Sequence, residues 1–254
     1  VNDLVCESHE DIAVLLAKSA SKFNFTTEEL ILTAFNKSIS EHFQSSNILV
    51  DIENNGRGQT TIDDSESVGW FTHIYPLAIN YSGCEGNLDS FIISTKEAFR
   101  DKQYAKNKYY QHDDALFKHG DILFNFFGDL RSSSAGETIK VSDIEKGSDV
   151  DLNNIIQHKL SLTGMIVNNG LKLSLSFNKT TFTANEVSSL LESICFNLKE
   201  IIESCLANTT PRKTPTDFKY VQIEEVEVID EIYKQSGEIE DIYPSTPLQM
   251  GMLH

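Results

Sequence analysis

The strongest candidate for chemistry in this sequence is Glu53, a carboxylate that closes an apolar run and precedes a turn. Residues 48–52 read ILVDI, and Gly56 and Arg57 follow Glu53 after two asparagines. A strand that ends at this point can project the carboxylate into a cleft, where it can act as a general acid or base. Arg57 fits two interpretations, a charge that positions this turn or an ordinary surface arginine.

The remaining reactive side chains form no recognisable catalytic or metal-binding pattern. Residues 112–114 (HDD) are potential metal ligands, but three adjacent residues on a helix cannot converge on one ion. The serines at 132–134 lack the glycines of a nucleophile elbow. The four cysteines form no Cys-x-x-Cys pair, so reduced thiols that serve as small core residues are expected. No two histidines are adjacent; they are His9, His42, His73, His112, His119, His158 and His254.

The charge balance argues against two classes of partner. The chain has 254 residues with 38 acidic and 21 basic side chains, and a formal charge of −17. Nucleic acids and anionic membranes attract surfaces rich in Lys and Arg, so neither is an expected partner. No apolar run approaches the roughly 20 residues that cross a bilayer. Residues 1–10 lack the basic-then-apolar order of a signal peptide, and we therefore expect a cytoplasmic protein.

Apolar periodicity predicts an α+β chain in which Glu53 ends the first predicted strand. Thr26 begins a helix with Glu29 three residues later, the pattern of a capping box, and Thr183 begins a second capped helix. Residues 168–170 (NNG) predict the tight turn of a hairpin. The predicted helices are 9–22, 26–39, 88–110 and 183–205, and the predicted strands are 47–53, 121–127, 160–167 and 171–177, with a strand, turn and strand around Pro76 in 68–80.

The chain changes character near residue 210. Residues 209–217 (TTPRKTPTD) are a Pro/Thr linker, and 222–242 are strongly acidic, which is typical of a solvated helix face. A Pro/Thr linker and a lone domain-opening segment cannot build a core, so we expect residues after about 210 to be dispensable for the fold. The sequence also does not begin with Met, which favours a fragment of a longer protein.

Four short segments form a recognisable set. Residues 53–57 read ENNGR, 68–76 read VGWFTHIYP, 124–128 read FNFFG and 241–253 read DIYPSTPLQMGML. The first three resemble the Glu-Gly-His-Gly-Arg, Val-Gly-Trp-Phe-Thr-x-x-Tyr-Pro and Phe-Asn-Tyr-Leu-Gly motifs of condensation-type domains of nonribosomal peptide synthetases. The fourth resembles the opening segment of a further domain of this kind. The second motif is typical of the epimerization subtype, because peptide-forming domains lack its Trp-Phe-Thr.

The resemblance implies a reaction and a role for each motif. It implies that Glu53 and a histidine exchange a proton across a tunnel, which inverts L to D at the Cα of a thioester on a peptidyl carrier domain. That histidine belongs to a His-His-x-x-x-Asp motif in the family's N-terminal lobe. This sequence contains no such motif, so the fragment alone is expected to be inactive. The residues expected to position the substrate or line the tunnel are Asn55, Arg57, Trp70, Phe71, Tyr75, Asn125 and Phe126.

The implied fold is α+β and resembles one chloramphenicol-acetyltransferase-like lobe, a two-layer sandwich of a mixed β-sheet with helices on one face. Residues 1–208 would form this C-terminal lobe, 209–237 a linker with an acidic helix, and 238–254 the opening segment of a following condensation-type domain. The implied partners are the N-terminal lobe of the same domain, a peptidyl carrier domain and the adjacent condensation domain. No metal or organic cofactor is implied, because the thioester itself acidifies the Cα–H bond and the phosphopantetheine arm belongs to the carrier.

Departures from the family motifs leave a second interpretation open. Asn54, Asn55 and Gly58 replace the family's Gly, His and Glu, and Phe126 replaces its Tyr. Residues 104–115 also do not match the family's Gly-Tyr-Gly element. These departures favour a catalytically degenerate lobe that docks a carrier domain or spaces modules. Peptide-bond formation is a third alternative, which the Trp-Phe-Thr of the second motif disfavours.

Overall fold

The computed structural model describes residues 2–7, 12–22, 24–57, 66–109, 119–130, 157–167, 169–207, 212–221, 223, 226–237 and 239–252. In these ranges the strands are β1 (Asn2–Glu7), β2 (Asn47–Asn54), β3 (His73–Asn80), β4 (Ile122–Asp129), β5 (Leu160–Val167) and β6 (Gly170–Phe177). The helices are α1 (Ile12–Lys22), α2 (Thr27–Phe43), α3 (Leu88–Tyr109), α4 (Ala184–Ala207), the 3-10 helix η3 (Pro215–Asp217), α5 (Val226–Ser236) and α6 (Pro247–Met252). None of the helices in these ranges has the length and apolar content that a membrane crossing requires.

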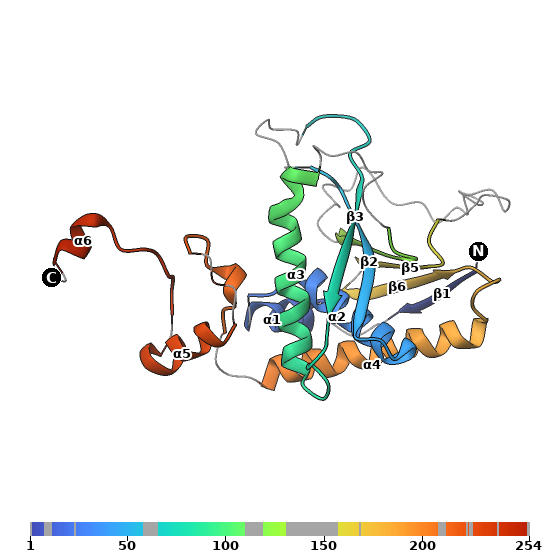
Figure 1. The fold of residues 1–254 in the computed structure, drawn as a ribbon. Coiled ribbons are helices and arrows are strands. Elements are labelled where there is room, and N and C mark those ends of the chain that lie inside the picture. Colours follow the sequence, from blue (N-terminus) through green and yellow to red (C-terminus); the bar gives the residue numbers. More distant parts are fainter. Residues whose placement is uncertain are drawn as a thin grey trace.

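The strands of the described residues form one mixed sheet in the order β1-β6-β5-β4-β2-β3 (Figure 1). β2 pairs with β4, and β4 with β5, in parallel, whereas the β1–β6, β5–β6 and β2–β3 pairs are antiparallel. The chain between β2 and β4 passes through β3 and the long helix α3. Because parallel strands end at the same edge of a sheet, the carboxyl ends of β2, β4 and β5 are neighbours.

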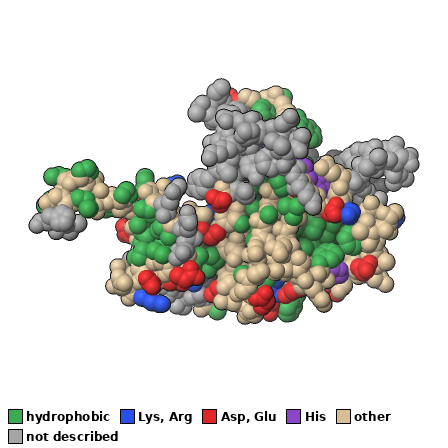
Figure 2. All heavy atoms as spheres, viewed as in Figure 1, with side chains coloured by type: hydrophobic (Ala, Val, Ile, Leu, Met, Phe, Trp, Pro, Cys, Tyr) green, Lys and Arg blue, Asp and Glu red, His purple; other side chains and the backbone are tan. Residues whose placement is uncertain are grey.

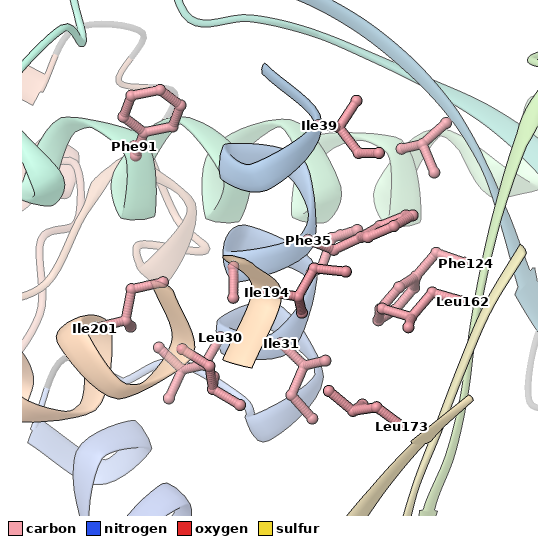
Figure 3. Packing of buried hydrophobic residues seen from close by; sticks show 14 of the residues in the cluster. Leu30, Ile31, Phe35, Ile39, Phe91, Phe124, Leu162, Leu173, Ile194 and Ile201 are labelled. Carbon is pink, nitrogen blue, oxygen red and sulfur yellow. The ribbon is translucent and has the colours of Figure 1, made fainter. Parts of the chain in front are cut away.

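Helices α1 to α4 pack on one face of the sheet and enclose the main core. Figure 3 shows Phe35 of α2 and Ile194 of α4 close to Phe124 of β4 and Leu162 of β5. The rings of Phe35 and Phe124 stack with their centroids 6.1 Å apart. The apolar stripes of the predicted helices supply these side chains, whose burial is the main favourable term in folding. The predicted two-layer α+β sandwich is therefore confirmed.

Local sequence signals place the ends of the two central helices. The Thr26 hydroxyl accepts from the Glu29 amide at 3.1 Å, and the Glu29 carboxylate accepts from the Thr26 amide at 2.8 Å. Thr183 and Glu186 form the same reciprocal pair at the start of α4, at 3.3 and 2.8 Å. Each box satisfies amides that the helix itself leaves without a partner. The helix starts predicted at these two threonines are confirmed.

Two strands differ from the sequence prediction. The expected turn at Pro76 is wrong, since β3 runs through this residue with Pro76 opposite Asp51 of β2. β3 is an edge strand in the described sheet, and an edge tolerates a residue that has no N–H to donate. β1 was not predicted, because its six residues (NDLVCE) carry no clear alternation. It pairs along its whole length with β6 at the opposite edge.

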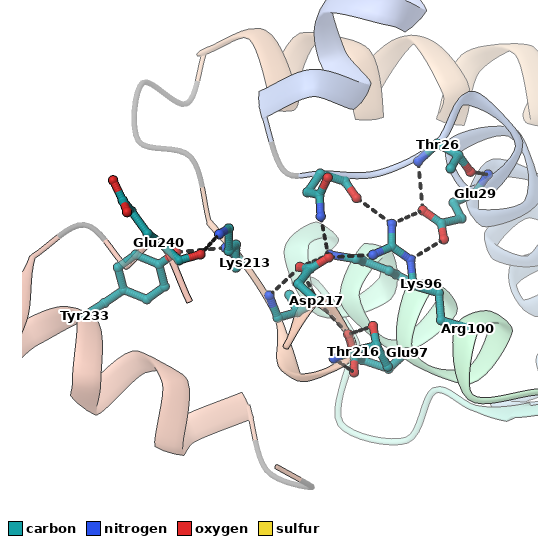
Figure 4. Close-up of polar contacts among 12 residues, drawn as sticks. Thr26, Glu29, Lys96, Glu97, Arg100, Lys213, Thr216, Asp217, Tyr233 and Glu240 are labelled. Atoms are coloured by element: carbon teal, nitrogen blue, oxygen red, sulfur yellow. Dashed lines mark hydrogen bonds and ion pairs between the residues drawn. The ribbon is translucent and has the colours of Figure 1, made fainter. Parts of the chain in front are cut away.

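Residues 212–218, which we call the strap, dock on α3 (Figure 4). The Asp217 carboxylate is fully buried and accepts hydrogen bonds from Lys96 Nζ and Arg100 Nη1, both at 2.5 Å. The Lys96 side chain is fully buried as well. Arg100 also binds Glu29 at the start of α2, with Nε 2.6 Å from the carboxylate. One chain of ion pairs thus joins the strap to α3 and α2.

A second carboxylate on α3 holds the turn of the strap. Glu97 accepts hydrogen bonds from the Thr214 hydroxyl at 2.5 Å, the Thr216 hydroxyl at 2.9 Å and the Thr216 amide at 3.0 Å. Thr214 is itself buried. These contacts argue against the expectation that residues after about 210 are dispensable for the fold. The domain boundary at residue 208 stays a prediction.

The buried carboxylate makes docking of the strap sensitive to acid. Burial alone would raise the pKa of Asp217, but the charges of Lys96 and Arg100 and the hydrogen bonds from Lys96 and the Thr214 amide hold it below its usual range. A depressed folded-state pKa contributes stability above the unfolded value of about 4, and this contribution is lost as the pH falls through the folded value. We expect the thermal midpoints of wild type and Asp217→Asn to differ by a constant amount from about pH 7 to 5. The difference should shrink below about pH 4; a constant difference down to about pH 2 would contradict this.

The chain beyond the strap extends away from the sheet and from helices α1 to α4 (Figure 1). Ile229 of α5 is buried with Phe218 and Ile239 in a small cluster separate from the main core. Figure 2 shows apolar side chains on the surface of the outermost part of this extension. They belong to α6, where Leu248 is 76% and Met252 is 80% exposed. Among the described residues α6 therefore has no core of its own, and the assignment of 238–254 to a following domain stays a prediction.

Candidate functional site

Glu53 lies near the carboxyl end of β2, on the face of the sheet that α1 to α4 leave uncovered. Side chains alternate along a strand, and Val50 and Ile52 are buried in the core beneath the helices. Asp51 and Glu53 therefore lie on the opposite side, which we call the open face. The Glu53 side chain is half-buried there. This placement agrees with a carboxylate that projects from the end of a strand.

Asn125, another predicted site residue, lies directly across from Glu53 on the neighbouring strand. In the parallel ladder between β2 and β4, Glu53 is the register partner of Asn125, and Asn125 is in turn the register partner of Thr163 on β5. Phe124 is fully buried in the core, so alternation places Asn125 on the open face. The sheet thus brings a carboxylate, an amide and a hydroxyl into one row.

The turn after Glu53 is fixed by the segment that carries the second motif. Gly56 has a φ of +63°, and a Cβ at this position would lie 1.7 Å from the carbonyl oxygen of Phe71, so only glycine fits. The Arg57 guanidinium lies 4.3 Å from the centre of the Phe71 ring, and its Nη2 donates to the Ser67 carbonyl at 2.9 Å. The Asn55 side chain accepts from the Arg57 amide at 3.1 Å. Asn55, Arg57 and Phe71 therefore form the scaffold of the turn.

Two other predicted residues, Tyr75 and Phe126, point into the core and away from Glu53, and a third, Trp70, is exposed. Tyr75 is buried in the core under the helices, on the side of β3 that faces away from Glu53. Phe126 packs against the same core, and its ring lies 3.1 Å from where a Cβ of Gly164 would be. Trp70 is 90% exposed, so it is not a core residue of the described chain.

Several sequence predictions fall on residues that the structure does not describe. Gly58, the run at 112–114 and the serines at 132–134 lie outside the described ranges, as do residues 110–115 of the segment 104–115. Within the described ranges, no group of three or more His, Cys, Asp or Glu side chains is arranged to hold a metal ion. Two of the thiols, Cys84 and Cys205, are buried in the core as expected.

Sequence reasoning missed a polar cluster beside Glu53. The fully buried Asp51 carboxylate contacts His119 Nδ1 at 2.9 Å and His158 Nε2 at 2.8 Å through one oxygen, and accepts from the Gly120 amide at 3.0 Å through the other. The histidines are isolated in the sequence, but each lies two or three residues before a strand. An acidic residue inside the apolar run of β2 was the available signal, since a buried carboxylate needs partners.

Comparison with known proteins gives the family. A family model described as "Condensation domain" matches residues 2–224, which is most of the chain. The chain belongs to the condensation domain family. The family match also extends past residue 208 and includes the strap.

Curated relatives of this condensation-family chain are much longer proteins. A mycosubtilin synthase polypeptide of Bacillus subtilis is 29% identical over 243 residues, which is 90% of this chain and 9% of that protein. Bacitracin synthase 1 of Bacillus licheniformis is 26% identical over 255 residues, 96% of this chain and 5% of that protein. The chain therefore spans less than a tenth of either relative.

Solved structures confirm the condensation-domain fold. The epimerization domain from the third module of tyrocidine synthetase B matches with a TM-score of 0.69 and 21% identity, over 81% of this chain and 49% of that one. The condensation domain from the monacolin K polyketide synthase MokA matches with a TM-score of 0.57 and 14% identity, over 80% of this chain and 47% of that one. This chain spans about half of each. The predicted chloramphenicol-acetyltransferase-like α+β fold is thus confirmed.

Proposed function

We propose that this condensation-family chain is the C-terminal lobe of an epimerization domain of a nonribosomal peptide synthetase. It would help to convert L to D at the Cα of an aminoacyl or peptidyl thioester on a peptidyl carrier domain. The observation that carries the proposal is the position of Glu53 at the end of β2, half-buried on the open face beside Asn125. The epimerization-like motif at 68–76, whose Phe71 packs on Arg57 next to this site, supports it.

The chemistry needs one proton-transfer group on each face of the substrate carbon. One base removes the Cα proton of the thioester, which the adjacent carbonyl acidifies, and the electron pair moves into an enolate. A second group then delivers a proton to the opposite face. Glu53 supplies one of the two groups, and the His-His-x-x-x-Asp motif of the N-terminal lobe supplies the other. No metal or bound organic cofactor enters this scheme, and the phosphopantetheine arm of the carrier holds the substrate.

The partners of the proposed function follow from the same scheme. They are the N-terminal lobe of the same domain, the carrier that presents the thioester, and a condensation domain that residues 238–254 would open. The exposed apolar side chains of α6, among them Leu248 and Met252, support the last assignment, because a short helix without a core needs one from elsewhere. A cytoplasmic location belongs to this proposal.

A second candidate is a degenerate lobe that docks a carrier or spaces modules. The observation that favours it is the state of Asn55, which replaces a titratable histidine of the family motif. Its side-chain oxygen accepts from the Arg57 amide at 3.1 Å, so this residue stabilises the turn, and its amide group does not titrate. The loss of the family's Tyr hydroxyl at Phe126 points the same way.

Exchange of the Cα proton with solvent tests the proposed function. We expect this polypeptide alone to exchange no Cα hydrogen of a carrier-bound aminoacyl thioester for solvent deuterium above the enzyme-free rate, because it supplies only one of the two groups. The same lobe joined to its N-terminal lobe should exchange rapidly, as measured by mass spectrometry of the released amino acid. Exchange by the polypeptide alone would contradict the two-lobe mechanism. A two-lobe protein that does not exchange the Cα hydrogen would favour the degenerate lobe.

A further inference from the structure

We propose that Asp51 is a positioning residue that holds the segments leading into β4 and β5 against β2, and thereby keeps Asn125 beside Glu53. This inference rests on the proposed function, because it assigns to Asp51 the geometry of the proton-transfer site. The device consists of Asp51, His119, Gly120 and His158, and we call it the Asp51 clasp.

The clasp gathers three donors from two separate segments on one buried carboxylate. His119 Nδ1 and His158 Nε2 lie 2.9 and 2.8 Å from the same oxygen of Asp51, and the Gly120 amide donates to the other oxygen at 3.0 Å. Asp51 is fully buried, His158 is 7% exposed, and His119 reaches the surface with 32% of its side chain. A buried carboxylate is tolerated only with such partners, so the three contacts depend on one another.

Both segments lead directly into strands of the site. His119 and Gly120 precede β4, which carries Asn125, and His158 precedes β5. The segments also bind each other, because the Asp121 carbonyl accepts from the amides of residues 159 and 160 at 2.7 and 3.2 Å. Asp51 therefore fixes the starting points of two neighbouring strands at once.

The β2–β4 ladder alone is a weak means of setting the site geometry. It pairs only three residues of β2, from Asp51 to Glu53, with residues 123–125 of β4. The approach before β4 is also tight, since a Cβ on Gly120 would lie 2.8 Å from the Leu49 carbonyl oxygen. The ladder and the clasp meet at Asp51, two residues before Glu53. A clasp that opens would free the start of β4 and displace Asn125 from Glu53.

The expected consequence is a fall in the rate of the chemical step. A misplacement of about 1 Å in an active site can cost about 10²-fold in rate. In the complete two-lobe protein we expect Asp51→Leu to lower kcat for epimerization at least about tenfold, with KM for the carrier-bound substrate within about twofold. Asp121→Asn is the matched control, because this carboxylate lies in the same segment but is 65% exposed and pairs with the likewise exposed Lys159 at 2.7 Å. Its kcat should equal that of wild type.

Combination with Glu53→Gln distinguishes positioning from general destabilisation. If Asp51 acts through the geometry around Glu53, then adding Asp51→Leu to a Glu53→Gln protein should lower kcat by less than about threefold. Full additivity of the two losses would overturn the clasp. If Glu53→Gln lowers kcat strongly and Asp51→Leu leaves kcat unchanged, the clasp is also overturned, and the proposed function stays intact. If Glu53→Gln leaves kcat unchanged, the proposed proton-transfer role of Glu53 is wrong.

A less disruptive variant and a second measurement test the proposal if Asp51→Leu does not fold. His119→Leu removes the partly exposed donor and leaves the other two in place. We expect a smaller fall in kcat than for Asp51→Leu. The losses in kcat from His119→Leu and Glu53→Gln should again be less than additive. Hydrogen exchange of the Gly120 amide should also accelerate in this variant and not in Asp121→Asn. Unchanged exchange at Gly120 together with unchanged kcat would refute the clasp.

Discussion

Glu53→Gln in the complete two-lobe protein should slow the conversion of L to D at the substrate Cα by at least about a hundredfold. Glutamine keeps the shape and hydrogen bonding of glutamate but does not titrate. General acid–base groups typically contribute about 10²–10⁴-fold, which corresponds to roughly 3–5 kcal/mol in the barrier. Binding of the carrier domain should change little, because we expect its docking surface to lie away from Glu53, which is half-buried at the end of β2.

The decisive measurement is the D-to-L ratio of the carrier-bound product against time, for wild type and Glu53→Gln in parallel. Asn55→His is the companion variant, since it restores the family residue in the adjacent turn. It should raise the rate or leave it unchanged, because the hydrogen bond of the Asn55 side chain is with the Arg57 amide. Equal rates for wild type and Glu53→Gln would remove Glu53 from the mechanism, and the degenerate docking lobe would then be the better account.

The parts of the fold that the sequence predicted are those with local signals. The capping boxes at Thr26 and Thr183 place helix starts because each needs only a residue three positions later. The turn at 168–170 predicts the β5–β6 hairpin because Asn169 adopts a positive φ of 66°, which asparagine tolerates. The position of Glu53 near the end of a strand was predictable for the same reason, because the apolar run before it is a local pattern, whereas its catalytic role stays a prediction.

The parts that escaped prediction depend on contacts between distant residues. His119 and His158 are 68 and 107 positions from Asp51, so no spacing rule connects them. Lys96 and Asp217 are 121 positions apart, and a Pro/Thr-rich segment gave no sign that it would be buried. The composition of this segment indicated a linker, but its docking depends on the pairing of Asp217 with Lys96 and Arg100 of α3. Such charge pairs are seen only once the helices and the sheet are assembled.

The strap on α3 leads to the largest expected change in stability. Asp217→Asn removes the charge opposite Lys96, whose side chain is fully buried, while Arg100 keeps its contact with Glu29. Removal of one partner of a buried ion pair typically costs about 3–5 kcal/mol, because the other charge is left without compensation. We expect a loss of this size in the free energy of unfolding by urea at pH 7. Asp230→Asn is the matched control, because it breaks the partly exposed pair with Arg212 and should cost less than about 1 kcal/mol.

Two further measurements connect this loss to the charge of Lys96. Burial lowers the pKa of Lys96, and the charge of Asp217 opposes this effect. In Asp217→Asn the folded state therefore releases the Lys96 proton at lower pH than the unfolded state does, so its stability should rise as the solution becomes alkaline. The double variant Lys96→Met with Asp217→Leu should regain most of the lost stability at pH 7, since apolar side chains of similar volume can replace a buried pair. An Asp217→Asn protein as stable as the Asp230→Asn control would show that the strap rests on the lobe without contributing to its stability.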